Sequence, residues 1–413
     1  MATNRIAHYQ YGSLYVDGVD LMALSDEIGT PCYVYSQDRA VDNLRSLQKA
    51  FPDAEIHYSL KANANLALVR TLVDSGAGLD AVSAGEIYKG LQAGVDPNMI
   101  VFAGVGKTEA ELKYALDVGV GWINVESGLE LARLARLAGQ LHKKPRVALR
   151  INPDVKADTH QYIATGHAAA KFGISLAEAG ELLEKYADSD EVTVEGIHIH
   201  IGSQLGTVER TVEAVQTVLP LFDQHSSLRA LNIGGGFPVS YTGDDVPEPA
   251  AFAAALEPIF ANRRLHLMIE PGRYVVADAG LLIVEVQYIK PSPAGVIVVT
   301  DGGMTELIRP ALYGATHDVM TLHDPASAEY TNSQVVGPVC ESADVLRNDV
   351  TLPTLQPGDR LAVMDTGAYG AVMGSNYNAR PRPPEVLVEG DTWRIVRRRE
   401  TWEDLIALER NIT

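Results

Sequence analysis

The sequence contains few cysteines and no long apolar run. Among its 413 residues only Cys32 and Cys340 are cysteines, so a disulfide framework is excluded and a reducing compartment is expected. No stretch approaches the roughly 18 uninterrupted apolar residues of a membrane helix, and residues 1–20 have no signal-peptide pattern. We therefore expect a cytoplasmic protein with no membrane partner.

Positive charge is also scarce. Lysine and arginine number 34 against 53 aspartates and glutamates, which gives a formal net charge of -19. Such a chain repels nucleic-acid phosphates, so we expect no nucleic-acid partner. The one dense basic run, residues 394–399, is interrupted by Ile395 and Val396, and this alternation predicts a strand with one solvated face.

Length and hydrophobic pattern predict an α/β protein with two domains. From residue 31 onward, short β-rich runs alternate with amphipathic helical segments, as in βα units around a parallel sheet. Eight or more such units within about 240 residues favour a (β/α)8 TIM-like barrel at 31–273 over an open doubly wound sheet. The predicted strands are residues 32–35, 55–60, 79–82, 100–102, 122–125, 147–151, 194–201, 231–233 and 267–269.

The C-terminal part has a different pattern, with strands and turns but few helices. Strands are predicted at residues 275–276, 281–289, 295–300, 361–364, 385–388 and 392–397. This pattern indicates a mostly β domain at 274–413. Residues 1–30 are assigned to the same domain, because the segment 14–21 has no barrel partner.

Lys61 is the first candidate for chemistry. In residues 55–63 the side chains of His57, Ser59 and Lys61 share one strand face, and Lys61 lies at the carboxyl end of the strand. A lysine directed into a barrel mouth loses hydration, which favours the neutral amine that forms a Schiff base. The alternative is a surface lysine that begins the next helix.

His198 and His200 share one face of a later strand. A His-x-His pair can bind zinc, but that arrangement needs further ligands at later strand ends, and none is visible. We therefore expect no metal and favour an imidazole that stacks on a flat cofactor.

Two more strands end in residues that are candidates for binding or catalysis. Residues 231–233 lead into three glycines at 234–236, whose backbone N–H groups can bind a phosphate, although the spacing departs from the dinucleotide fingerprint at Val239. Residues 267–269 lead into Glu270 and Arg273. The pair is either a structural salt bridge or, if the ligand is a pyridine ring, a carboxylate that keeps the ring nitrogen protonated.

Seven short segments, taken in order, resemble the diaminopimelate decarboxylases. They are residues 58–63, 198–203, 234–236, 270–273, 309–313, 337–342 and 367–370, and the resemblance extends over residues 10–390. It implies a pyridoxal 5'-phosphate (PLP) enzyme with an alanine-racemase-like barrel and a C-terminal β domain. It also implies a homodimer whose active sites are shared across the interface.

The resemblance further implies a role for each matching residue. Lys61 would form the Schiff base, His200 would stack on the ring, and Glu270 would meet the pyridine nitrogen. Cys340, a candidate proton donor, and Glu341 would enter from the partner subunit. The phosphate would be surrounded by Ser203, Gly235, Gly236, Glu270, Pro271, Gly272, Arg273 and Tyr369. The substrate would be contacted by Arg273, Arg309, Tyr313, Glu341 and Tyr369.

The reaction implied is decarboxylation of meso-diaminopimelate to L-lysine and carbon dioxide, the last step of lysine biosynthesis. Glu270 argues against a racemase, because the resemblance to racemases on the same fold would imply arginine, not glutamate, at the ring nitrogen. A decarboxylase of D-lysine or D-ornithine type is the enzymatic alternative. A non-catalytic PLP-binding relative is the other, although it would be expected to lose Lys61, Glu270 or Cys340. Asn232 departs from the common pattern and has no assigned role.

Overall fold

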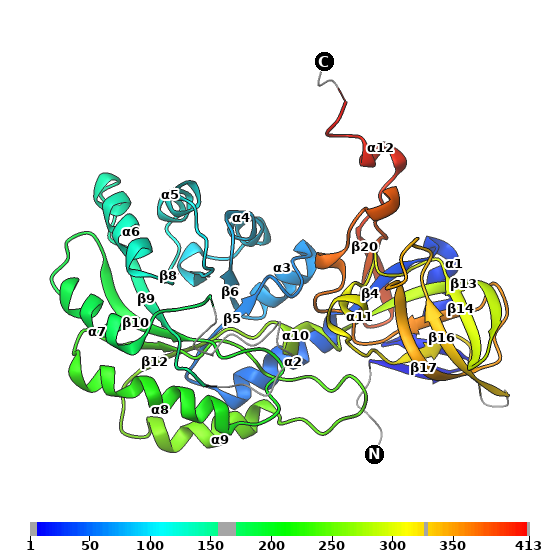
Figure 1. Cartoon of the computed structure of the whole chain (residues 1–413), viewed down its shortest axis with the longest axis horizontal. Helices are drawn as coiled ribbons and strands as arrows, with labels where there is room; N and C mark the ends of the chain where they lie inside the picture. Colours follow the sequence, from blue (N-terminus) through cyan, green and yellow to red (C-terminus); the bar gives the residue numbers. More distant parts are fainter. Residues whose placement is uncertain (1–5, 156–170, 326–328, 411–413) are drawn as a thin grey trace. The chain divides into compact units, whose positions relative to one another are not determined.

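The computed structural model describes residues 6–155, 171–325 and 329–410 and divides into two compact units (Figure 1). One, which we call the barrel unit, comprises Asp42–Val239 and Asp245–Tyr274. The other, the β unit, comprises Met1–Val41, Ser240–Asp244 and Val275–Thr413.

Eight parallel strands of the barrel unit close into a barrel, which confirms the predicted fold. They follow one another around the barrel in sequence order, and the last pairs with the first through Met268 and Ile269. The strands are β5 (Glu55–Ser59), β6 (Gly78–Ala81), β7 (Ile100–Phe102), β8 (Trp122–Val125), β9 (Arg146–Ile151), β10 (Thr193–Ile199), β11 (Ala230–Asn232) and β12 (His266–Ile269).

Amphipathic helices lie around these strands (Figure 1). They are α2 (Gln37–Ala50), α3 (Leu66–Asp74), α4 (Ala84–Ala93), α5 (Glu109–Val118), α6 (Gly128–Gln140), α7 (Leu176–Lys185), α8 (Glu209–Gln224) and α9 (Pro249–Phe260). Ser83, Thr108, Ser127 and Ser175 cap four of them by accepting a backbone N–H of the first turn. Because the strands are parallel, their carboxyl ends meet at one rim of the barrel.

The strand at residues 32–35 does not belong to the barrel, contrary to our expectation. β4 (Cys32–Ser36) is buried along its whole length and pairs with β13 and β19 of the β unit. A short strand buried on both faces has the same hydrophobic pattern in either sheet, so only its long-range pairing distinguishes the two. The division between the units accordingly falls after Val41, not at residue 31.

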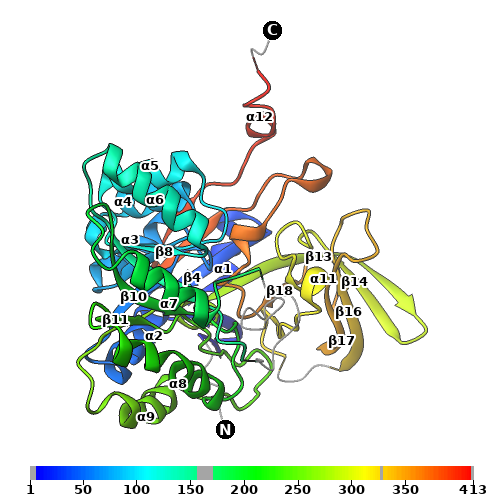
Figure 2. The ribbon, with the colours of Figure 1, turned by 60° about the vertical axis from the view of Figure 1, so that its left-hand side comes forward.

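The β unit is built on a nine-stranded sheet, part of which Figure 2 shows. With β4 it contains β13 (Gly280–Ser292), β14 (Gly295–Thr300), β15 (Val319–Thr321), β16 (Tyr330–Val336), β17 (Val345–Pro353), β18 (Arg360–Val363), β19 (Glu385–Glu389) and β20 (Thr392–Arg397). The sequence pattern missed β15, β16 and β17. It also wrongly placed a strand at residues 275–276, which lie in the short helix α10 (Arg273–Val276).

The N-terminal segment joins the β unit, as expected. β1 (Ala7–Gln10), β2 (Ser13–Val16) and β3 (Val19–Asp20) form a small sheet that leads into α1 (Leu21–Ile28). Their apolar side chains share one buried cluster with residues of β13, including Leu281 and Ile283.

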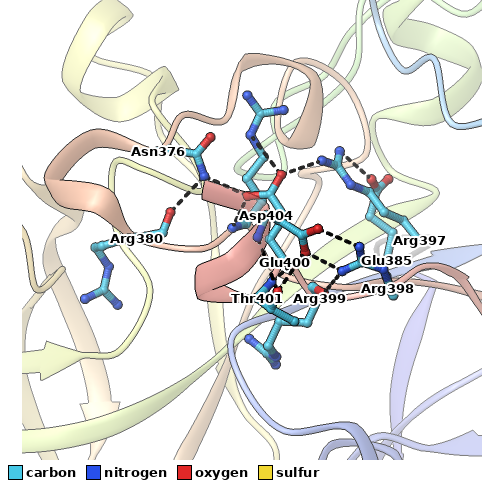
Figure 3. A network of polar contacts seen from close by, with 10 residues as sticks. Asn376, Arg380, Glu385, Arg397, Arg398, Arg399, Glu400, Thr401 and Asp404 are labelled. Carbon is cyan, nitrogen blue, oxygen red and sulfur yellow. Dashed lines mark hydrogen bonds and ion pairs between the residues drawn. The ribbon is translucent and has the colours of Figure 1, made fainter. Parts of the chain in front are cut away.

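Two arginines of the C-terminal basic run, Arg397 and Arg398, form ion pairs within the β unit (Figure 3). Arg397 lies 3.4 Å from Glu385 and 3.2 Å from Glu400, while Arg398 donates to Asp404 at 2.7 Å at the start of α12 (Trp402–Leu405).

No helix within the described ranges is long and apolar enough to cross a membrane.

Candidate active site

Lys61 follows β5 at the carboxyl rim of the barrel. Its Nζ lies 3.5 Å from Oδ2 of Asp80, which also accepts a hydrogen bond of 2.6 Å from the Ser59 hydroxyl. Burial, reinforced by the nearby Glu270 carboxylate, raises the pKa of Asp80 above its ordinary value. The Lys61 side chain is 40% exposed, so the strong desolvation expected from the sequence is not observed. The amine instead has a buried carboxylate, Asp80, as an ion-pair partner.

Glu270 follows β12 and is 6% exposed. Its Oε1 accepts hydrogen bonds from the side-chain amides of Asn232, at 2.6 Å, and Asn124, at 3.2 Å. His198 Nε2 lies 3.2 Å from its Oε2. Burial alone would raise the pKa of Glu270, but His198 and Lys61 outweigh it, and the pKa lies below its ordinary value. The side chain is therefore a carboxylate fixed in orientation, not one half of a surface salt bridge with Arg273.

The two histidines have different surroundings. His198 faces Glu270, whereas Nδ1 of His200 accepts the backbone N–H of Gly235 at 3.2 Å. Burial, helped by the positive charges of Lys61 and Arg150, lowers the pKa of His200 well below its ordinary value. A neutral imidazole held by its backbone contact is suited to stacking on an aromatic ring. Within the described residues, no cluster of three or more His, Cys, Asp or Glu side chains could hold a metal ion.

The three glycines after β11 form a turn that excludes side chains. Gly234 and Gly236 have φ angles of 69° and 109°. A Cβ at Gly235 would lie 2.4 Å from the carbonyl oxygen of Glu270, and one at Gly234 would lie 2.7 Å from His200 Nδ1. Only glycine therefore lets the backbone approach the His200 and Glu270 segments this closely.

Arg273 and Ser203 belong to segments of the barrel unit that touch this turn, since a Cβ at Gly236 would lie 2.9 Å from the carbonyl oxygen of Gly202 and one at Gly235 would lie 3.8 Å from Pro271 Cα. The guanidinium donates to the Ser203 hydroxyl from Nε at 3.1 Å and from Nη2 at 3.0 Å, although Arg273 is only 8% exposed. Gly272 lies against Ser59 and Ala62, where a Cβ would approach to 3.0 and 3.1 Å. Pro271 accepts the backbone N–H of Ser59 at 3.0 Å, which joins this segment to the strand that carries Lys61.

Five other predicted site residues belong to the β unit. Arg309 begins α11 (Arg309–Tyr313) and is only 6% exposed. It donates to His317 Nε2 at 2.8 Å, and its guanidinium lies 4.7 Å from the centroid of the Tyr241 ring. Tyr313 at the end of α11 is half-buried, as is Tyr369, which has a φ of 58°.

Cys340 and Glu341 lie on an exposed loop of the β unit. Asp344 shapes this loop by accepting the backbone N–H groups of Val339 and Met304, both at 2.6 Å. The hydroxyl of Tyr377 donates to Glu341 at 3.2 Å. Both side chains are thus presented at the surface of this unit by a buried carboxylate that the sequence motif did not reveal.

The barrel residues fit PLP in three respects. The glycine turn and the Arg273–Ser203 pair provide backbone and cationic groups for a phosphate, and Glu270 provides a fixed carboxylate for a ring nitrogen. Sequence reasoning missed Asp80 and Asn124 and gave Asn232 no role. Each is a polar residue in an otherwise apolar buried strand, and that is the signal by which they could have been found.

Comparison with known proteins agrees with this geometry. Residues 37–277 match the family described as the pyridoxal-binding domain of pyridoxal-dependent decarboxylases. The diaminopimelate decarboxylase of Aquifex aeolicus is 40% identical over 408 residues, which cover 98% of this chain and 97% of the relative. The chain belongs to the diaminopimelate decarboxylase family.

Solved structures of diaminopimelate decarboxylases are similar over almost the whole chain. The M. jannaschii enzyme in co-complex with L-lysine has a TM-score of 0.93 and 34% identity and covers 99% of this chain and 98% of its own. The Helicobacter pylori enzyme complexed with L-lysine has a TM-score of 0.90 and 38% identity, with 94% and 98% covered. As a member of this pyridoxal-dependent family, the chain uses PLP as its cofactor.

Proposed function

We propose that this chain decarboxylates meso-2,6-diaminopimelate to L-lysine and carbon dioxide, as the last step of lysine biosynthesis. One observation carries the proposal: a buried carboxylate, Glu270, is held by Asn232, Asn124 and His198 at the same rim as Lys61. Relatives of the same family that were solved with L-lysine support the identity of the product.

Each residue predicted to bind the cofactor then has a task, including Tyr369 of the β unit. When bound, PLP supplies a ring that accepts the electron pair released as the α-carboxylate leaves. Lys61 holds the cofactor through its amine, and Glu270 keeps a proton on the ring nitrogen. The neutral His200 stacks on the ring. The phosphate is surrounded by Ser203, Gly235, Gly236, the 270–273 turn including Pro271, Gly272 and Arg273, and Tyr369.

The β unit, together with Arg273 of the barrel unit, supplies substrate recognition in this proposal. Arg309, Tyr313, Tyr369, Glu341 and Arg273 contact the amino acid, and a guanidinium suits the distal carboxylate that distinguishes diaminopimelate from lysine. A buried polar site left unpaired by a substrate without this group discriminates by about ten-thousandfold. Cys340 returns the proton to the α-carbon.

The protein functions as a cytoplasmic homodimer in this proposal, with Cys340 and Glu341 reaching the site of the partner subunit. Mixing the variants Lys61→Ala and Cys340→Ala tests this sharing, because a mixed dimer restores one intact site. Activity that stays at the level of the separate variants after subunit exchange contradicts the shared site.

The activity itself is tested by incubating the purified protein with PLP and single amino acids. Carbon dioxide and L-lysine should form from meso-diaminopimelate. Release of carbon dioxide from D-lysine, L-lysine, D-ornithine or arginine should be far slower. Preference for D-lysine or D-ornithine would favour the alternative decarboxylase, and no release from any substrate would favour a non-catalytic PLP-binding protein.

A further inference from the structure

The side-chain amide of Asn232 joins two parts of the barrel site. Its Nδ2 donates to Glu270 Oε1 at 2.6 Å, and its Oδ1 accepts the backbone N–H of Gly234 at 2.9 Å. Asn232 ends β11 and is completely buried. One planar group thus bonds both the carboxylate assigned to the ring nitrogen and the first residue of the glycine turn assigned to the phosphate.

We propose that Asn232 is a positioning residue that couples the orientation of the Glu270 carboxylate to the conformation of the 234–236 glycine turn, so that the two ends of the cofactor are bound as a unit. This inference rests on the proposed function, which places PLP between these groups. A second contact between the same segments supports the coupling, because Glu270 donates its backbone N–H to the carbonyl oxygen of Gly234 at 2.8 Å.

The chemistry of the amide explains why asparagine is needed for both bonds. It carries two donors and one acceptor on a short side chain, whereas leucine of similar shape offers neither. An ionised aspartate would still accept from Gly234 but would set a second negative charge against Glu270. Without a donor at residue 232, the Glu270 carboxylate loses a charge-assisted hydrogen bond. The loss of such a bond changes a folding or binding equilibrium by about ten- to a hundredfold.

Asn124 provides a matched comparison within the same site. It donates to the same oxygen of Glu270, at 3.2 Å, from β8. Its own Oδ1 is buried and accepts no hydrogen bond from any of the described residues, so its side chain does not hold the glycine turn. Removal of the Asn124 amide should therefore disturb Glu270 alone, while removal of the Asn232 amide disturbs Glu270 and the turn together.

Asn232→Asp gives the sharpest test because it keeps the shape of the side chain. At low pH one proton shared between residue 232 and Glu270 restores the donor, and the other oxygen still accepts from Gly234. Burial and the adjacent carboxylate raise the pKa of that shared proton, so the bond is lost as pH rises. The titratable groups that act on Glu270 are Lys61, Asp80, His198 and His200, and Arg150 in turn acts on His200.

The experiment compares Asn232→Leu, Asn232→Asp and Asn124→Leu with the surface control Asn348→Asp, all as the full chain. Three properties are measured: the PLP dissociation constant, the absorbance of bound PLP from about pH 6 to 9, and the melting temperature without PLP. We expect Asn232→Leu to weaken PLP binding by about tenfold more than Asn124→Leu does, because only Asn232→Leu also releases the glycine turn. Asn232→Asp should bind PLP nearly normally at about pH 6 and about tenfold more weakly at about pH 9, with a new ionisation in the spectrum.

Equal losses of PLP affinity in Asn232→Leu and Asn124→Leu would overturn the coupling. An Asn232→Asp protein whose PLP affinity and spectrum follow the pH dependence of Asn348→Asp would overturn it as well, and this outcome is decisive even if Asn232→Leu does not fold. Failure of the proposed function is a different result, namely wild-type protein that binds PLP but releases no carbon dioxide. The comparison of PLP affinities does not depend on that reaction.

Discussion

The candidate residues of the barrel unit and those of the β unit are held in different ways. In the barrel unit, Glu270 and His200 are fixed by side chains and backbone groups from neighbouring strand ends. In the β unit, Arg309 contacts the side chains of His317 and Tyr241. Cys340 and Glu341 lie exposed on a loop of the same unit.

This difference indicates that the residues of the two units have different functions. Buried groups with several fixed hydrogen bonds lose little orientation and suit a cofactor that stays bound. Exposed loop residues can contact a substrate or a second subunit. Substitutions in the barrel unit should therefore alter cofactor binding and the chemical step, whereas substitutions in the β unit should alter substrate binding or proton return.

The largest effect is expected for Lys61→Ala. Loss of the amine should lower activity by at least about a thousandfold and abolish the pyridoxyl group that borohydride attaches to this residue. Peptide mass analysis after reduction measures this directly. Lys113→Ala, on the surface of α5, is the control. A pyridoxyl group on another lysine of the wild-type protein would break the assignment of the barrel site.

Glu270→Gln should slow turnover by about a hundredfold while PLP affinity falls by less than about tenfold. The amide keeps the shape of the side chain but lacks the charge that retains a proton on the ring nitrogen. Single-turnover kinetics and PLP titration separate the two quantities. Equal losses in both would mean that Glu270 serves the fold and not the chemical step.

Arg309→Met should separate the β unit from the barrel unit. We expect KM for meso-diaminopimelate to rise by about a hundredfold, because a charge-assisted pair with the distal carboxylate is lost, while PLP affinity stays unchanged. Steady-state kinetics and PLP titration test this, with Arg394→Met on the exposed part of β20 as the control. A loss of PLP affinity comparable to that of Lys61→Ala would contradict the assignment of cofactor binding to the barrel unit and substrate binding to the β unit.

The smallest effect concerns a carboxylate of the barrel unit outside the proposed chemistry. Burial raises the pKa of Glu86 from 4.5 to about 7. The neutral form therefore stabilises the fold below about pH 4.5, and this stability is lost as pH rises through 7. The glutamine of Glu86→Gln stays neutral over this range. Between pH 5 and 8 the free energy of unfolding should therefore fall by about 1–2 kcal/mol less in this variant than in the wild-type protein. Urea denaturation at both pH values measures it. The exposed Glu184→Gln should keep the wild-type pH dependence.

Much of the barrel could be predicted because its elements are local. Strand and helix alternate with clear periodicity, and parallel strands oblige their carboxyl ends to meet, so the order of the motifs was enough to group Lys61, His200 and Glu270. The strand 32–36 could not be assigned in this way. Its hydrophobic residues fit any buried sheet, and its partners β13 and β19 lie about 250 and 350 residues further along the chain.

The sequence alone was sufficient to determine the barrel, the family and the cofactor, because short-range periodicity and residue order encode them. Only the tertiary structure decided that Asn232 and Asn124 hold Glu270, that Asp80 faces Lys61 and that Arg309 is buried. These relations join side chains from strands far apart in the chain, and hydrogen-bond geometry between them exists only after the strands have closed into a barrel or a sheet.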